Sequence, residues 1–302
     1  MNVLISGSSG LIGSALASFL AAGGHSVGRL VRRAGPSGGA EVFWDPQAGL
    51  LDPARLEGFD GVVHLAGDSI AEGRWTEQKK RRLLDSRVKG TRLLSEALSR
   101  TQRPPRVMVC ASAVGYYGNR GAELLREDSP PGSLFLSRLC REWEEAAEPA
   151  RRKGIRVVHP RFGVVLSALG GALAKMLFPF RMGLGGRIGS GEQYMSWIAI
   201  DDVLGVVLHA LTTESLRGPT NAVTPSPVTN SEFTRTLGRV LGRPTVFPMP
   251  AFAAHLAFGE MADELLLASA RVDPAKLRDS GYRFQYPDLE PALRHLLGGA
   301  RA

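Results

Sequence analysis

The stretch "MNVLISGSSGLIGSALASFLAAGG" (residues 1–24) decides the fold class. A short apolar run leads into a glycine-rich turn and then into an apolar helical pattern, so we predict a strand over 2–6 and a helix over 11–22. No basic residues precede the apolar run and glycines interrupt it, which favours a first structural unit over a secretion signal. We therefore expect a cytoplasmic protein.

The turn in this stretch has the pattern G-x-x-G-x-x-G, with Gly7, Gly10 and Gly13 at its three glycine positions. Between a strand and a helix, such glycines make the tight turn, admit a pyrophosphate close to the backbone and pack the helix on the strand. The helix N-terminus adds amide donors and a favourable dipole for the anion. The sequence thus predicts a dinucleotide-phosphate site formed by Gly7, Ser9, Gly10, Leu11, Ile12 and Gly13.

The end of the next predicted strand indicates which dinucleotide binds. An acidic residue there would bind the ribose 2′-hydroxyl of NAD, but the chain reads "RLVRR" (29–33), with no Asp or Glu between the turn and Glu41. Arg32 lies 19 residues after Gly13 with Arg33 beside it, and a guanidinium fork suits a 2′-phosphate. We predict NADP(H) as the cofactor; the alternative is a solvated loop arginine.

Apolar runs alternate with helical patterns through the first half of the chain. We predict strands over 26–31, 41–44, 61–67, 106–112 and 155–160, and helices over 76–99 and 133–149. Near-continuous Val, Ile and Leu strands separated by helices are typical of a parallel sheet covered on both faces, the doubly wound α/β class.

The segment "HLAG" (64–67) ends the strand predicted over 61–67. Small residues there let the backbone pass close to the adenosine side of a cofactor, so we add Leu65, Ala66 and Gly67 to the cofactor site. His64 is interpreted as a packing residue rather than a base.

The length of 302 residues indicates two lobes. We predict a cofactor-binding domain over 1–165, with 201–215 packing back on it, and a C-terminal lobe over 166–302. In that lobe we expect a glycine-rich loop at 183–193, a strand over 194–200 and helices over 201–213, 231–242, 251–270 and 288–297. No apolar run is long enough to span a membrane.

The formal net charge of +8 comes with basic residues spread along the chain, most of them arginines. Without zinc-finger spacing or an aromatic RNA-binding strand, we expect no nucleic-acid partner. Cys110 and Cys140 are interpreted as buried hydrophobic residues, and no cluster has metal-ligand spacing, so no metal is predicted. The quaternary structure is expected to be a monomer or a homodimer.

Several longer motifs carry a family resemblance. "GSSGLIG", "VVHLAG" and "ASAVGYYG" resemble the extended short-chain dehydrogenase/reductase superfamily. "LCREWEEAA", "RFGVVLS", "GLGGRIGSGEQYMSWIAIDD" and "RVDPAKLRDSGYRFQYPDLEPAL" resemble the YfcH-like epimerase subgroup. The resemblance implies an NAD(P)-binding Rossmann fold, a smaller C-terminal α/β substrate lobe with a family-specific tail over about 248–296, and epimerase or oxidoreductase activity on a small molecule.

The resemblance also implies a Ser/Thr, Tyr and Lys catalytic set, in which a lysine and the cofactor ring lower the tyrosine pKa. If Glu144 matches the family glutamate after the lysine, the tyrosine position holds Leu136 and the lysine position holds Cys140. A shift by one residue gives Phe135 and Leu139, which are also apolar.

The family pattern has two further positions, a serine and an asparagine. The serine position corresponds to Ser112 or Ala113, and the usual asparagine of the preceding helix is Arg87. Tyr116 and Tyr117 are candidate acids, with Arg87 or Lys89 lowering the pKa; the alternative is that "GYYG" is a structural turn whose tyrosines pack.

Helix 133–149 places an apolar stripe where the tyrosine and lysine would face the cofactor. Two functions follow from the sequence. One is an NADP(H)-dependent oxidoreductase or nucleotide-sugar epimerase-like enzyme that uses Ser112, Tyr116, Tyr117 and Arg87. The other is a non-catalytic, cofactor-binding regulatory protein, since one branch of the resembling family is linked to cell division.

Overall fold

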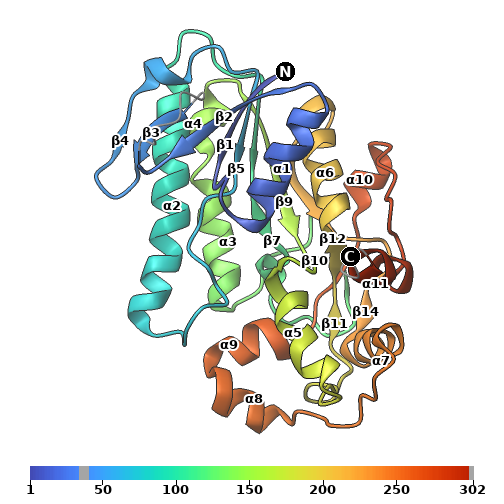
Figure 1. Ribbon diagram of the computed structural model, residues 1–302. Coiled ribbons are helices and arrows are strands. Elements are labelled where there is room, and N and C mark those ends of the chain that lie inside the picture. The colour runs from blue at the N-terminus through green and yellow to red at the C-terminus, as the bar shows by residue number, and fades with distance from the viewer. Residues whose placement is uncertain (34–40, 299–302) are drawn as a thin grey trace. The chain divides into compact units, whose positions relative to one another are not determined.

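The computed structural model describes residues 1–33 and 41–298, which form two compact units (Figure 1). The first unit consists of Met1–Ser112, Leu139–Pro160 and Leu204–Thr220. The second unit consists of Ala113–Arg138, Arg161–Val203 and the chain from Asn221 onward. The two units therefore interleave along the sequence; the division predicted near residue 165, with 201–215 packing back on the first domain, stays a prediction.

The first unit is built on a mostly parallel sheet in the order β13-β9-β6-β5-β1-β2-β3-β4. Within this order, β4 pairs antiparallel with β3. The strands are β1 (Asn2–Ser6), β2 (Ser26–Val31), β3 (Glu41–Asp45), β4 (Leu50–Leu51), β5 (Gly61–His64), β6 (Val107–Cys110), β9 (Arg156–Phe162) and β13 (Gly218–Ala222). This is the doubly wound α/β architecture that the sequence predicts.

Helices cover both faces of this sheet. Figure 1 shows α1 (Leu11–Ala22) and α6 (Ile200–Thr212) on one side and α2 (Glu77–Ser99) and α4 (Glu148–Arg152) on the other. The long helix α2 begins at a conventional cap, because the Thr76 hydroxyl accepts a hydrogen bond from the Lys79 amide at 3.1 Å. A short 3₁₀ turn, η1 (Pro53–Leu56), precedes β5.

The predicted helix over 133–149 is two helices, α3 (Phe135–Glu145) and α4. Pro149 lies in the first turn of α4, where its missing N–H removes no helical hydrogen bond, whereas it would break a helix interior. The start of α3 is capped from a distance, since the amides of Phe135 and Leu136 donate to the Glu264 carboxylate at 2.9 and 2.7 Å.

The second unit consists mainly of short elements. Its strands and turns are β7 (Ser112–Ala113, which begins at the last residue of the first unit's opening segment), η2 (Val114–Tyr117), β8 (Leu124–Leu125), β10 (Val164–Ser167), β11 (Tyr194–Met195), β12 (Trp197–Ala199), β14 (Val228–Thr229) and β15 (Arg271–Val272). Its helices are α5 (Gly171–Arg181), α7 (Asn230–Leu241), α8 (Ala251–Phe258), α9 (Glu260–Ala262), η3 (Asp263–Leu267), α10 (Ala275–Asp279) and α11 (Leu289–Gly298).

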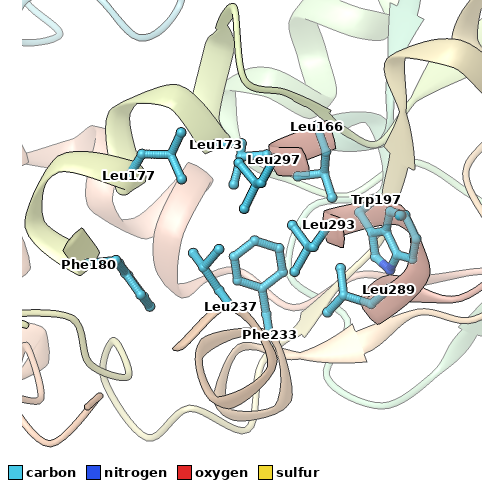
Figure 2. Packing of buried hydrophobic residues seen from close by; sticks show 11 residues of the cluster. Leu166, Leu173, Leu177, Phe180, Trp197, Phe233, Leu237, Leu289, Leu293 and Leu297 are labelled. Carbon is cyan, nitrogen blue, oxygen red and sulfur yellow. The ribbon is translucent and has the colours of Figure 1, made fainter. Parts of the chain in front are cut away.

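The core of the second unit joins α5, α7, α11 and the strands β10 and β12. In Figure 2, Phe233 of α7 lies beside Leu293 of α11, and Trp197 of β12 closes one end of the cluster. Burial of each such side chain contributes about 1.5–3 kcal/mol.

The predicted helical pattern over 251–270 is divided among α8, α9 and η3 because Gly259, at φ +60°, ends α8. None of the helices in the described ranges is long and apolar enough to cross a membrane.

Candidate cofactor and catalytic site

Strand register gathers the predicted cofactor residues at one edge of the sheet in the first unit. Ser6 lies opposite both Leu30 and His64, and His64 lies opposite Cys110. Because these strands are parallel, the residues that follow them leave the sheet at the same carboxyl edge. The glycine turn, Arg32, the segment 65–67 and Ser112 therefore lie along this edge.

The glycine turn requires glycine at two of its positions. Gly7 has φ +69°, and a Cβ there would lie 2.8 Å from the carbonyl carbon of Leu65 and 2.9 Å from the amide nitrogen of Ala66. A Cβ on Gly13 would overlap the carbonyl oxygen of Gly7. The turn, the start of α1 and the chain after β5 are thus in backbone contact, which matches the roles of the first and third glycines.

The N-terminus of α1 follows directly on the glycine turn. Gly10 is its N-cap residue and supplies no side-chain cap, and the first turn contains no acidic residue. The Gly10 amide itself donates to the Gly7 carbonyl at 3.0 Å, which closes the turn. The amides of the first helical turn, at Leu11, Ile12 and Gly13, have no acceptor within the helix, and amides in this position generally favour an anion. Ser9 lies exposed on the same turn.

A buried Ser6–His64 pair holds the segment after β5 in place. The Ser6 Oγ accepts hydrogen bonds from the amides of Leu65 and Ala66 at 3.1 and 3.3 Å, so its own proton points to Nδ1 of His64 at 2.6 Å. Burial lowers the pKa of His64 to about 4, which keeps the ring neutral, and its edge packs against Trp44. These contacts support the interpretation of His64 as a packing residue.

Arg32 and Arg33 follow β2 at the same edge and are both exposed. Within residues 1–33 and 41–298, neither makes an ion pair. Two guanidinium groups without a carboxylate partner leave this corner of the unit positively charged.

Arg87 on α2 lies over Gly67. A Cβ on Gly67 would be 3.2 Å from the guanidinium carbon of Arg87, so glycine provides the space that this side chain occupies. The guanidinium stacks 5.1 Å above the Trp143 ring and donates to the Leu83 carbonyl at 3.2 Å. The pKa of Arg87 is lowered, because the effect of burial outweighs the opposing effect of the neighbouring Cys140 and Asp68. A largely buried cation therefore stands beside the segment that we predict to contact the cofactor.

Ser112 has a carboxylate partner that sequence reasoning did not identify. Its buried hydroxyl donates to Oε1 of Glu144 at 2.7 Å. In the sequence, Glu144 served only to align the helix with the family pattern, and nothing local indicates that its side chain turns inward. The two apolar positions of that pattern, Leu136 and Cys140, are buried on α3.

The two candidate tyrosines lie in the second unit and differ in their surroundings. Tyr117 is fully buried, donates to Oδ1 of Asn221 at 2.6 Å and accepts from the Arg161 guanidinium at 2.9 Å. Burial raises the pKa of Tyr117 to about 12. Tyr116 is partly exposed, with the Arg161 guanidinium carbon 3.4 Å from its ring centroid. Among the described residues the Tyr116 hydroxyl makes no hydrogen bond, so it remains available to a ligand.

Comparison with protein-family models assigns most of the chain. Residues 3–222 match the NAD dependent epimerase/dehydratase family. The chain belongs to this family. Residues 249–296 match a domain of unknown function, DUF1731, at the place where the resemblance implies a family-specific tail.

Individual family members are similar along their whole length. An epimerase family protein of Mycobacterium bovis, Mb2239, is 45% identical over 291 residues, 96% of each chain. The epimerase family protein YfhF of Bacillus subtilis is 36% identical over 301 residues, 98% of each chain. The crystal structure of human epimerase family protein SDR39U1 (isoform 2) with NADPH covers 99% of both chains at 37% identity, with a TM-score of 0.90. The predicted fold and family resemblance are confirmed.

Proposed function

We propose that this epimerase-family chain binds NADP(H) at the carboxyl edge of its sheet. The observation that carries the proposal is the open N-terminus of α1, whose donors face the glycine turn at Gly7–Gly13. The pyrophosphate would lie on these amides, and Leu65, Ala66 and Gly67 would border the adenosine side. The related human protein, crystallised with NADPH, supports this choice of cofactor.

Arg32 and Arg33 would bind the 2′-phosphate. They follow β2 one and two residues after Val31, and Leu30 on that strand is level with Ser6 at the start of the turn. Arginine recognises phosphate through paired N–H donors, and no acidic side chain at the end of β2 competes for the 2′ position. The cofactor would supply or accept the hydride.

We propose further that Ser112, with Glu144 behind it, handles the proton. In the direction of substrate oxidation, a substrate hydroxyl passes its proton to the Ser112 oxygen while the Ser112 proton moves to the Glu144 carboxylate over 2.7 Å. The reverse order returns both protons. Arg87, beside Gly67, would stabilise negative charge that develops on the substrate oxygen. The substrate of this reaction is unknown.

We keep Tyr116 as a second candidate proton donor, because its hydroxyl makes no hydrogen bond within the described chain. Tyr117 is the weaker candidate, since both hydrogen bonds of its hydroxyl are already used. The buried apolar side chains of Leu136 and Cys140 favour the alternative function, a regulatory protein that binds the cofactor without turnover.

The cofactor proposal is tested by measuring NADPH and NADH dissociation constants for the wild type and for Arg32→Asp. The wild type should bind NADPH at least tenfold more tightly, since one charge-assisted contact contributes roughly 1.5–3 kcal/mol, and the variant should lose this preference. Arg92→Asp, an exposed position on α2, is the control for charge and should change neither constant. Equal affinity of the wild type for the two cofactors would overturn the proposal.

The catalytic proposal is tested by following NADPH oxidation with a panel of carbonyl compounds and nucleotide sugars. Ser112→Ala and Glu144→Gln should reduce turnover by at least a hundredfold and leave the NADPH dissociation constant unchanged. Ser95→Ala removes another buried hydroxyl of the same unit, one that accepts the Ala150 amide, and should retain activity. Full activity in both site variants would refute the Ser112–Glu144 role, whereas tight NADPH binding with no turnover by the wild type would favour the regulatory function.

A further inference from the structure

The second unit contains a cavity of about 480 Å³, open to solvent, that the proposed function does not use. This volume lies within the range of roughly 300–1,000 Å³ that is usual for small-molecule sites. The polar residues that line it are Arg187, Glu192, Ser231, Thr234, Arg235 and Thr245. They come from the glycine-rich loop before β11, from the start of α7 and from the chain that follows α7.

The cavity has an excess of positive charge. Arg187 donates to the backbone carbonyl of Ser190 at 2.8 Å, and across the described chain neither Arg187 nor Arg235 pairs with a carboxylate. Glu192 lines the same cavity and is exposed, so the three charges sum to one positive charge. Two unpaired guanidinium groups facing one cavity are a typical arrangement for binding a phosphate group.

Three hydroxyl side chains also line the wall of the cavity. Thr234 is 3% exposed, and its side chain makes no hydrogen bond to any residue in the two described ranges. Ser231 and Thr245 add two more hydroxyls to the same wall.

The walls of the cavity are held in place by backbone hydrogen bonds. The Ile188 amide donates to Oδ1 of the buried Asn230 at 2.7 Å, and the Ser231 amide donates to the Gly191 carbonyl at 2.8 Å. Gly191 has φ +78°, and a Cβ there would overlap the Ser231 hydroxyl. The loop therefore fits closely against the N-terminus of α7, and the polar groups are positioned before any ligand arrives.

We propose that this cavity binds a phosphorylated, hydroxyl-bearing small molecule of the sugar-phosphate class. The phosphate lies between Arg187 and Arg235 and accepts the Thr234 hydroxyl hydrogen, while Glu192 accepts hydrogen bonds from ligand hydroxyls. The cavity is too large for inorganic phosphate alone, whose volume is only about that of a few water molecules. No residue of this site takes part in the proposed cofactor site.

The experiment is a calorimetric titration of the full chain with glucose 6-phosphate, with glucose as the uncharged control. NADPH is kept saturating so that the glycine turn is occupied, and the titration is repeated without it. We expect saturable binding of glucose 6-phosphate alone. Arg187→Gln and Arg235→Gln should each weaken it about tenfold or more, because a hydrogen bond to a charged group contributes roughly 1.5–3 kcal/mol.

Two further variants separate this site from nonspecific charge effects. Arg283→Gln removes an exposed arginine of the same unit away from the cavity and should leave the affinity unchanged. Glu192→Gln should tighten the binding of inorganic pyrophosphate, since it removes the only negative side chain among the cavity residues named above. The absence of saturable binding, or equal affinity in Arg187→Gln, Arg235→Gln and Arg283→Gln, would overturn the proposal. Because the arginine variants leave the glycine turn intact, NADPH affinity in the same proteins reports on the cofactor proposal separately.

Discussion

The carboxyl edge of the sheet in the first unit and the polar network of the second unit both carry polar groups, and the hydrogen bonds of these groups are satisfied differently. At the sheet edge, the backbone donors of α1 and the guanidinium of Arg32 have no protein acceptor among the described residues. In the second unit, Asp202 is fully buried and accepts hydrogen bonds from the Tyr282 hydroxyl and from the amides of Gln285 and Tyr286.

This difference distinguishes polar groups that can bind a ligand from polar groups that support the fold. Donors without an acceptor are retained where a ligand provides one, whereas a carboxylate with three internal donors fixes a loop and offers nothing to a ligand. On this criterion Asp202 belongs to the structural class, although a second carboxylate, Asp201, lies beside it in the chain. Stability measurements can test the classification residue by residue.

The largest effect is expected from Asp202→Ala. The substitution leaves the Tyr282 hydroxyl and two backbone amides without their acceptor, and we expect a loss of about 3–5 kcal/mol in the free energy of unfolding. Denaturant unfolding of the full chain measures it. Asp201→Ala is the matched neighbour, since Asp201 contacts the exposed His295 at 3.3 Å, and it should cost under about 1 kcal/mol. Similar losses in both variants would contradict the assignment of Asp202 as the structural carboxylate.

The second prediction concerns the free energy of unfolding at acid pH, and it tests whether His64 supports the sheet edge. Burial lowers the pKa of His64 to about 4, so below pH 6.5 the unfolded chain binds a proton that the folded chain excludes. The free energy of unfolding should therefore fall by up to about 3 kcal/mol as the pH decreases from 6.5 to 4. In His64→Asn this part of the pH dependence should disappear.

A second histidine provides the control for that measurement. Burial also lowers the pKa of His209, which is partly exposed, so His209→Gln should leave most of the acid loss in place. An unchanged pH profile in His64→Asn would show that His64 is not the buried neutral ring that holds the segment 65–66 through Ser6.

The parts of the molecule that follow from the sequence are those controlled by neighbouring residues. The glycine turn, α1 and α2 lie within one residue of their predicted bounds, because periodicity and capping are local properties. Sheet order follows as well, since parallel strands joined by helices allow few arrangements. The placement of Arg32 at the carboxyl edge is a consequence of that register.

Contacts between residues far apart in the chain could not be predicted in this way. Glu264 caps α3 from about 130 residues away, and Glu144 turns inward to meet Ser112 although the adjacent Glu145 is exposed. The predicted helix over 133–149 ends early for a local reason, Pro149, that the periodicity concealed. The prediction of the cofactor edge therefore rests on local patterns, whereas the catalytic assignments depend on long-range partners.

The smallest effect concerns the two adjacent tyrosines. Tyr117→Phe removes a hydroxyl that bridges Asn221 and Arg161, and we expect a loss of about 1–2 kcal/mol in the free energy of unfolding. Tyr116→Phe removes a hydroxyl with no hydrogen bond inside the described chain, and it should change stability by less than about 0.5 kcal/mol. Denaturant unfolding of both variants at neutral pH measures the contrast.

Alkaline pH distinguishes the two tyrosines further. Burial raises the pKa of Tyr117 to about 12, so between the unfolded value, near pH 10, and pH 12 the unfolded chain releases a proton that the folded chain keeps. The wild type should lose stability as the pH rises through this window, and Tyr117→Phe should not, so the difference between them should narrow. If instead Tyr116→Phe removed this pH dependence, Tyr116 would be the structural tyrosine, and Tyr117 would become the candidate proton donor.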